Sequence, residues 1–101
     1  ERSGIYIAPM GDDAALYAVC LTEKIRRAGI KAETDTVGRS LKAQMKYANK
    51  IGAAYVIVLG DNEISSGKAE LRNMSDSTSA EIMLDSVVDT IKNIADRKEE
   101  K

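Results

Sequence analysis

Short strand-like runs alternate along the chain with segments in which apolar residues recur at helical spacing. Strand-like runs cover 4–9, 30–36 and 54–59, the first stopped by Pro9 and the last almost wholly apolar. Between them, apolar residues three or four positions apart predict helices over 12–29 and 40–53. We expect Asp12 or Asp13 to cap the first helix, Gly29 to end it, and Ser40 to cap the second.

The last third of the chain has a different pattern. A polar loop is expected over 60–67, followed by strands over 68–74 and 80–84 joined by a turn of small polar residues. Asp85 is a candidate cap for a final helix, whose charged end, 96–101, is expected to fray. The buried side of that helix is predicted to carry Val87, Val88, Ile91, Ile94 and Ala95.

This order of elements predicts one α/β domain spanning 1–101, with three α/β/α layers and a five-stranded mixed sheet. The first three strands should be parallel and the last two should form a hairpin. Ligands of such sheets meet the loops beyond the carboxyl ends of the parallel strands. These loops are 9–13, 35–40 and 60–67.

Composition excludes several functional classes. The 101 residues contain no histidine, which removes His-based acid–base catalysis and Cys-His zinc sites. Cys20 is the single cysteine; it is expected in the core of the first helix, and it weakly favours a reducing compartment. No apolar run approaches the roughly 20 residues of a membrane span. The net charge of −1 argues against generic binding of polyanions.

Charge is distributed unevenly. No acidic residue lies between Thr36 and Gly60, whereas Arg39, Lys42, Lys46 and Lys50 all do. The start of the predicted second helix therefore combines basic side chains with free backbone N–H groups, a combination that suits a phosphate or a base edge. A solvated helical face is the alternative interpretation of the same pattern.

The segment 38–53, GRSLKAQMKYANKIGA, resembles the second helix of the anticodon-binding domain of histidyl-tRNA synthetases. The runs IAPMG at 7–11, YVIVLGDNE at 55–63 and LRNM at 71–74 resemble the same family. Threonyl-, prolyl- and glycyl-tRNA synthetases share this class IIa fold without the RSLKAQMK run. The turn after Met74 departs from the family pattern, which puts the form of that hairpin in doubt.

The resemblance implies a domain that grips the anticodon stem-loop of tRNA-His and reads its GUG anticodon. Histidylation, with its ATP and magnesium, would belong to a separate catalytic domain of the same chain. We therefore expect no catalytic residue, cofactor or metal in this segment. A homodimeric cytoplasmic parent enzyme is expected, with neither DNA nor a membrane as partner.

Residues of the predicted second helix are the first candidates for RNA contacts. Arg39 and Lys42 would contact phosphates or base edges. Gln44 and Lys46 are weaker candidates, because helical geometry can turn one of them away from the ligand. Tyr47 is expected to pack rather than to stack on a base.

A second set of candidates lies on the first two strands and their loops. Glu33 and Asp35 could accept hydrogen bonds from the N–H groups of guanine, although an exposed sheet edge explains them equally well. Met10 and Gly11 would let the backbone approach an unstacked base, as readers of single-stranded RNA require.

Glu63 and Arg72 are further candidate contacts, with an ion pair between them as an alternative. A different function is a receiver-type signalling domain, in which Asp12, Asp13 and Asp61 would hold magnesium. Capping explains the first two better. The same fold also serves in a stress-responsive kinase and a mitochondrial polymerase accessory subunit, and a purely structural or dimerisation role is a further possibility.

Overall fold

A five-stranded mixed sheet forms the centre of the molecule. The computed structural model describes residues 3–99, and the backbone alone for 94–99. The strands are β1 (Ile5–Pro9), β2 (Ala32–Thr34), β3 (Tyr55–Leu59), β4 (Lys68–Asn73) and β5 (Ser79–Met83), in the spatial order β2-β1-β3-β4-β5. As predicted, β1 is parallel to β2 and β3, whereas β4 is antiparallel to β3 and β5.

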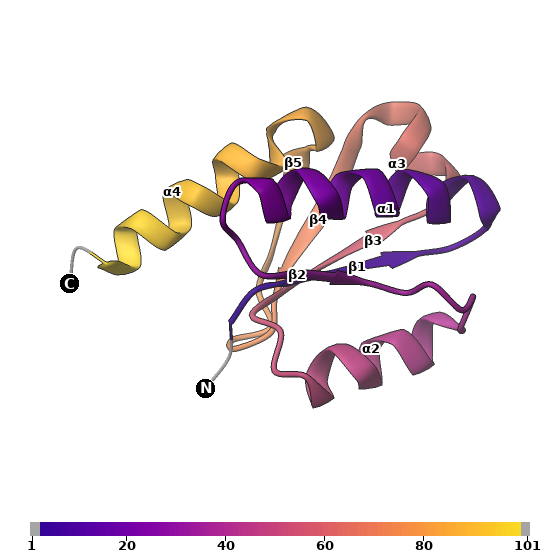
Figure 1. Cartoon of the computed structure of the whole chain (residues 1–101), viewed down its shortest axis with the longest axis horizontal. Coiled ribbons are helices and arrows are strands. Elements are labelled where there is room, and N and C mark those ends of the chain that lie inside the picture. Colours follow the sequence, from indigo (N-terminus) through magenta and orange to yellow (C-terminus); the bar gives the residue numbers. More distant parts are fainter. Residues whose placement is uncertain (1–2, 100–101) are drawn as a thin grey trace.

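Helices cover both faces of the sheet, which confirms the predicted three layers (Figure 1). One face carries α1 (Asp12–Arg27), α3 (Asp61–Ser66) and α4 (Val87–Glu99), the last preceded by a 3₁₀ turn at Leu84–Ser86. The other face carries α2 (Leu41–Lys50). No helix among residues 3–99 is both long and apolar enough to cross a bilayer.

The core consists of two apolar clusters separated by the sheet. The larger packs Ile5, Ile7 and Ile57 against the buried stripe of α1 and the start of α4. The smaller packs Tyr6 and Val56 against α2. Successive side chains of β1 and β3 therefore enter opposite clusters, as the alternation of a strand covered on both faces requires.

The ends of the first two helices differ from the prediction in one respect. Ser40 caps α2 as expected, because its Oγ accepts a hydrogen bond from Ala43 N at 3.2 Å. The prediction that Asp12 or Asp13 caps α1 is wrong. The N-cap is Gly11, which makes no side-chain cap bond, and both aspartates lie in the first helical turn, where their charge suits the helix dipole.

Other local predictions also need correction. The expected polar loop over 60–67 contains α3, which ends at Gly67 in the left-handed conformation. Cys20 is exposed rather than buried, so it is not a core residue. Leu41, one of the apolar residues whose spacing predicts the second helix, is 38% exposed. Asp85 lies within the 3₁₀ turn before α4 rather than at its cap. The predicted frayed segment, 96–101, and the side chains of Ile94 and Ala95 lie outside what is described in full.

Candidate nucleic-acid interface

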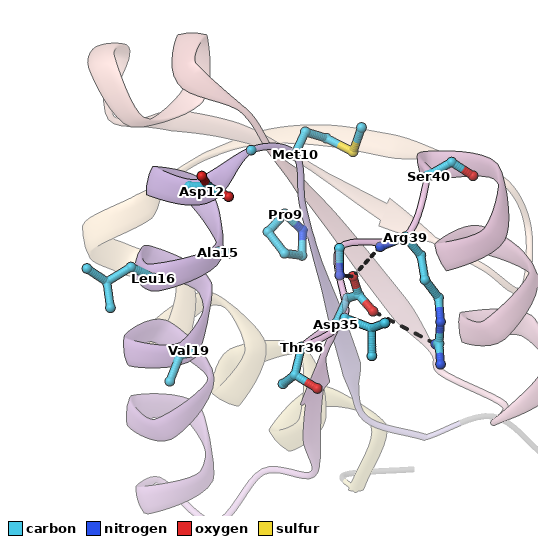
Figure 2. A pocket seen from close by; sticks show the side chains of 13 residues that line it. Pro9, Met10, Asp12, Ala15, Leu16, Val19, Asp35, Thr36, Arg39 and Ser40 are labelled. Atoms are coloured by element: carbon cyan, nitrogen blue, oxygen red, sulfur yellow. Dashed lines mark hydrogen bonds and ion pairs between the residues drawn. The ribbon is translucent and has the colours of Figure 1, made fainter.

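A cleft of about 720 Å³ opens where the parallel strands β1 and β2 end (Figure 2). Its walls are the β1–α1 turn, the first two turns of α1 and the loop between β2 and α2. This is the edge at which α/β sheets bind ligands, and the volume lies within the range of ligand pockets. Two of the three predicted ligand loops therefore meet here, whereas the third, around α3, contributes no lining residue.

Part of the cleft wall is apolar although it faces solvent. Val19 of α1 is 48% exposed, Val37 is 71% exposed and Met10 is 37% exposed. Leu16 lies at the same wall and is 70% exposed. An unstacked base offers an apolar face of the size that such a wall can cover.

Asp35 holds the loop that forms the opposite wall. Its Oδ2 accepts hydrogen bonds from Gly38 N and Arg39 N, both at 2.8 Å. Gly38 has a φ of 84°, a left-handed conformation that glycine adopts without a steric penalty. The Asp35 side chain is 1% exposed, so its carboxylate bonds groups of the protein and not solvent. The loop is thus fixed by a local acceptor.

Arg39 is held on two sides. Its Nη1 lies 3.8 Å from Asp35 Oδ1, and its guanidinium carbon lies 5.2 Å from the centroid of the Tyr47 ring. That ring meets the Tyr6 ring edge to face, with centroids 5.9 Å apart. The Arg39 side chain remains 42% exposed, so a positioned cation borders the cleft. Tyr47 packs against the smaller apolar cluster, as expected.

The Tyr47 ring under Arg39 contacts Tyr6, a polar side chain in the core. Tyr6 is fully buried and its hydroxyl has no hydrogen-bond partner among the described residues. Burial raises the pKa of Tyr6 to about 12, helped by the negative charge of Asp35 and opposed by Arg39. The tyrosine is therefore neutral at physiological pH and does not offset the positive charge above it.

The candidate residues of the first strand and its turn are placed at the cleft. Met10 and Gly11 both line it. Gly11 has a φ of 107°, and a Cβ at this position would meet no other atom within 4 Å. The glycine is therefore required by the backbone conformation, and it leaves the floor of the turn open.

The two acidic candidates are placed differently from each other. Asp35 lines the cleft, but its buried carboxylate serves the loop, so direct acceptance from guanine would require the loop to rearrange. Glu33 lies in a neighbouring hollow of about 300 Å³ and forms an ion pair with Arg26 at 3.9 Å. The placement of Asp35 thus argues against the hypothesis that it accepts hydrogen bonds from guanine. Glu33 is half-buried beside the cleft.

The candidates of α2 divide as helical geometry allows. Lys42 and Lys46 are exposed, and neither lines the cleft. Gln44 is 0% exposed, so the prediction that it contacts RNA directly is not supported by its placement. Its side chain points into the protein and bonds the backbone there.

Glu63 and Arg72 lie away from the cleft. Glu63 Oε1 accepts a hydrogen bond from Gly60 N at 2.8 Å and so caps α3. Arg72 is exposed on β4, on the face opposite buried Leu71. Within residues 3–99 no ion pair joins Glu63 and Arg72.

The apolar wall was not foreseen from the sequence. Leu16 and Val19 are apolar residues of α1 that lie outside its buried stripe of Ala14, Ala18, Leu21 and Ile25, and this mismatch was the available signal. Among the described residues no cluster of His, Cys, Asp or Glu could hold a metal ion. Asp12, Asp13 and Asp61 therefore do not form the acidic pocket of a receiver domain.

Comparison with known proteins agrees with this geometry. The family model described as "Anticodon binding domain" matches residues 4–94. The chain belongs to the anticodon-binding domain family. It is 54% identical over 84 residues to a histidine–tRNA ligase of Clostridium perfringens, which covers 83% of this chain and 20% of the relative.

Two further matches extend over more of the chain. A histidine–tRNA ligase of Acetivibrio thermocellus is 49% identical over 92 residues, which is 91% of this chain and 22% of the relative. The structure of the apo histidyl-tRNA synthetase of S. aureus matches with a TM-score of 0.86 and 41% identity, over 89% of this chain and 23% of that one. This anticodon-binding domain thus spans about a fifth of the length of these relatives.

Proposed function

We propose that this anticodon-binding domain reads the GUG anticodon of tRNA-His as the C-terminal module of a histidine–tRNA ligase. The observation that carries the proposal is the cleft at the ends of β1 and β2, which is lined both by exposed apolar residues and by Arg39. Bases of a single-stranded loop can be splayed into such a cleft, while Arg39, Lys42 and Lys46 attract the phosphates. The choice of tRNA-His rests on the similar relatives, which are histidine–tRNA ligases.

The remaining reactions are assigned to the rest of the proposed parent enzyme. ATP-dependent activation of histidine, with magnesium, would take place in a catalytic domain of the same chain. We propose that this parent is a cytoplasmic homodimer. The domain itself contributes affinity and selectivity for the anticodon stem-loop and carries out no chemical step.

The direct test is a titration with two anticodon stem-loops at fixed moderate salt. One carries GUG and the other a scrambled anticodon in the same stem. Tighter binding of GUG, with backbone amide shifts at 9–11 and 35–42, is the expected result. Equal weak binding that disappears as salt rises would leave only phosphate attraction and contradict the proposal.

Arg39→Ala tests the cation at the cleft. We expect this change to weaken GUG binding by about 1–3 kcal/mol and to reduce the preference for GUG, as loss of a base-edge contact does. The matched control is Arg27→Ala, because Arg27 also forms an ion pair at 3.8 Å four residues from its partner, at the far end of α1. Equal losses in the two variants would contradict a role for the cleft.

A further inference from the structure

Gln44 is a polar side chain in a core position of α2. It is 0% exposed, and its Nε2 lies 3.0 Å from Pro9 O and 2.9 Å from Arg39 O. The Sδ of Met10 lies 4.0 Å from the same nitrogen. A primary amide has two N–H groups, so the two backbone carbonyls use its full donor capacity.

The two carbonyls belong to the two walls of the cleft. Pro9 ends β1 at the turn that contains Met10 and Gly11, whereas Arg39 ends the loop after β2. Backbone pairing between β1 and β2 ends at Ile7 and Thr34, before the cleft begins. Beyond that point the side chain of Gln44 bonds both walls at once.

Burial of the Gln44 side-chain amide costs free energy, which the hydrogen bonds of its two N–H groups must offset. Gln44 Oε1 is buried without a hydrogen-bond partner in the described part of the chain. A buried acceptor without a partner destabilises a fold, but an apolar side chain here would leave the Pro9 and Arg39 carbonyls without their donors. The glutamine therefore contributes through its bonds to the two loops and not through apolar packing.

We propose that Gln44 is a positioning residue for RNA recognition, which fixes the spacing between the Met10–Gly11 turn and Arg39 before the ligand arrives. It touches no ligand itself and acts through the two backbone carbonyls. A binding surface held in its bound geometry loses less conformational entropy on association. The RNA-dependent part of this inference rests on the proposed function.

Gln44→Met is the informative change, because methionine is unbranched and of similar length but has no N–H donor. We expect GUG binding to weaken about five- to tenfold, with a similar fall in the ratio of GUG to scrambled affinity. The slope of affinity against salt should stay unchanged, because no cation is removed. In the free protein, the amide signals of Met10, Gly11 and Arg39 should shift and exchange faster.

The control must separate this effect from a general loss of stability. Leu71→Val removes a methylene from a buried residue of β4, away from the cleft. It should lower stability while keeping the ratio of affinities. If Gln44→Met does not fold, Gln44→Asn replaces it, because its shorter side chain cannot bond both carbonyls. We expect Gln44→Asn to show the weaker GUG binding and the amide shifts given above for Gln44→Met.

Two results would overturn the inference. One is a folded Gln44 variant that keeps the wild-type ratio of affinities and the wild-type loop signals. The other is an equal loss of the ratio in Leu71→Val. If the wild-type protein itself shows no preference for GUG, the proposed function fails, and the amide signals of the free variants still decide whether Gln44 couples the loops.

Discussion

Removal of the Asp35 carboxylate should destabilise the domain more than any surface charge does. The change Asp35→Ala leaves the backbone N–H groups of Gly38 and Arg39 without their acceptor, each now bonded at 2.8 Å. Hydrogen bonds to a charged group contribute roughly 1.5–3 kcal/mol each. Both donors belong to exposed residues, and water can replace part of the loss. We therefore expect a decrease of about 2–3 kcal/mol in the free energy of unfolding.

Asp35→Asn separates hydrogen bonding from charge. The amide oxygen can still accept both bonds, while the ion pair with Arg39 at 3.8 Å is lost. Because the Arg39 side chain is 42% exposed, that pair is screened, and the expected cost is about 1 kcal/mol or less. The order of stability should therefore be wild type, then Asn, then Ala.

Urea denaturation followed by far-ultraviolet circular dichroism measures these differences. The denaturant dependence should be the same in all variants, so that a change in midpoint reports stability alone. Glu23→Ala is the matched control, since Glu23 forms an exposed ion pair with Arg27 at 3.8 Å and should cost no more than about 0.5 kcal/mol. A loss below about 0.5 kcal/mol for Asp35→Ala would refute the role given to this carboxylate.

Two further changes test other parts of the structure. Ser40→Ala removes the cap bond to Ala43 N and should lower stability by about 1 kcal/mol, measured by the same urea titration; an unchanged midpoint would show that water replaces the cap. Tyr6→Phe tests the raised pKa. A group whose pKa is higher in the folded state stabilises fully below its unfolded pKa of about 10, and this contribution is lost as pH rises toward about 12. Wild type should thus lose roughly 2 kcal/mol more than Tyr6→Phe between pH 9 and pH 12, and equal losses would contradict the shift.

The fold could be predicted because its signals are local and periodic. Helical spacing of apolar residues located α1 and α2, and the apolar run at Tyr55–Leu59 identified a strand covered on both faces. The 3₁₀ turn and α3 were missed because short elements lack room for a periodic pattern. Two signs of a capped helix were available for α3. One is the glycine at each of its ends, and the other is Glu63, whose carboxylate accepts a hydrogen bond from Gly60 N.

The site could be predicted only in outline. The sequence and the resemblance led to the edge of the sheet at which the cleft opens and to Arg39, which lines it, but not to the orientation of Gln44. Position 44 is one turn before Ala48, on the buried side of α2, while its polarity argued for solvent. The two assumptions conflict because the amide N–H bonds a carbonyl 35 residues away along the chain. Pattern analysis does not detect such a partner.

The stacking of Arg39 on Tyr47 also gives the protein a built-in optical probe. The chain has no tryptophan and its only aromatic residues are four tyrosines, so near-ultraviolet signals come from these rings alone. One of them carries the guanidinium at 5.2 Å and touches the Tyr6 ring edge to face. A change in the position of Arg39 would alter the chiral environment of both rings, so near-ultraviolet circular dichroism of the RNA-free protein reports on this contact without any label.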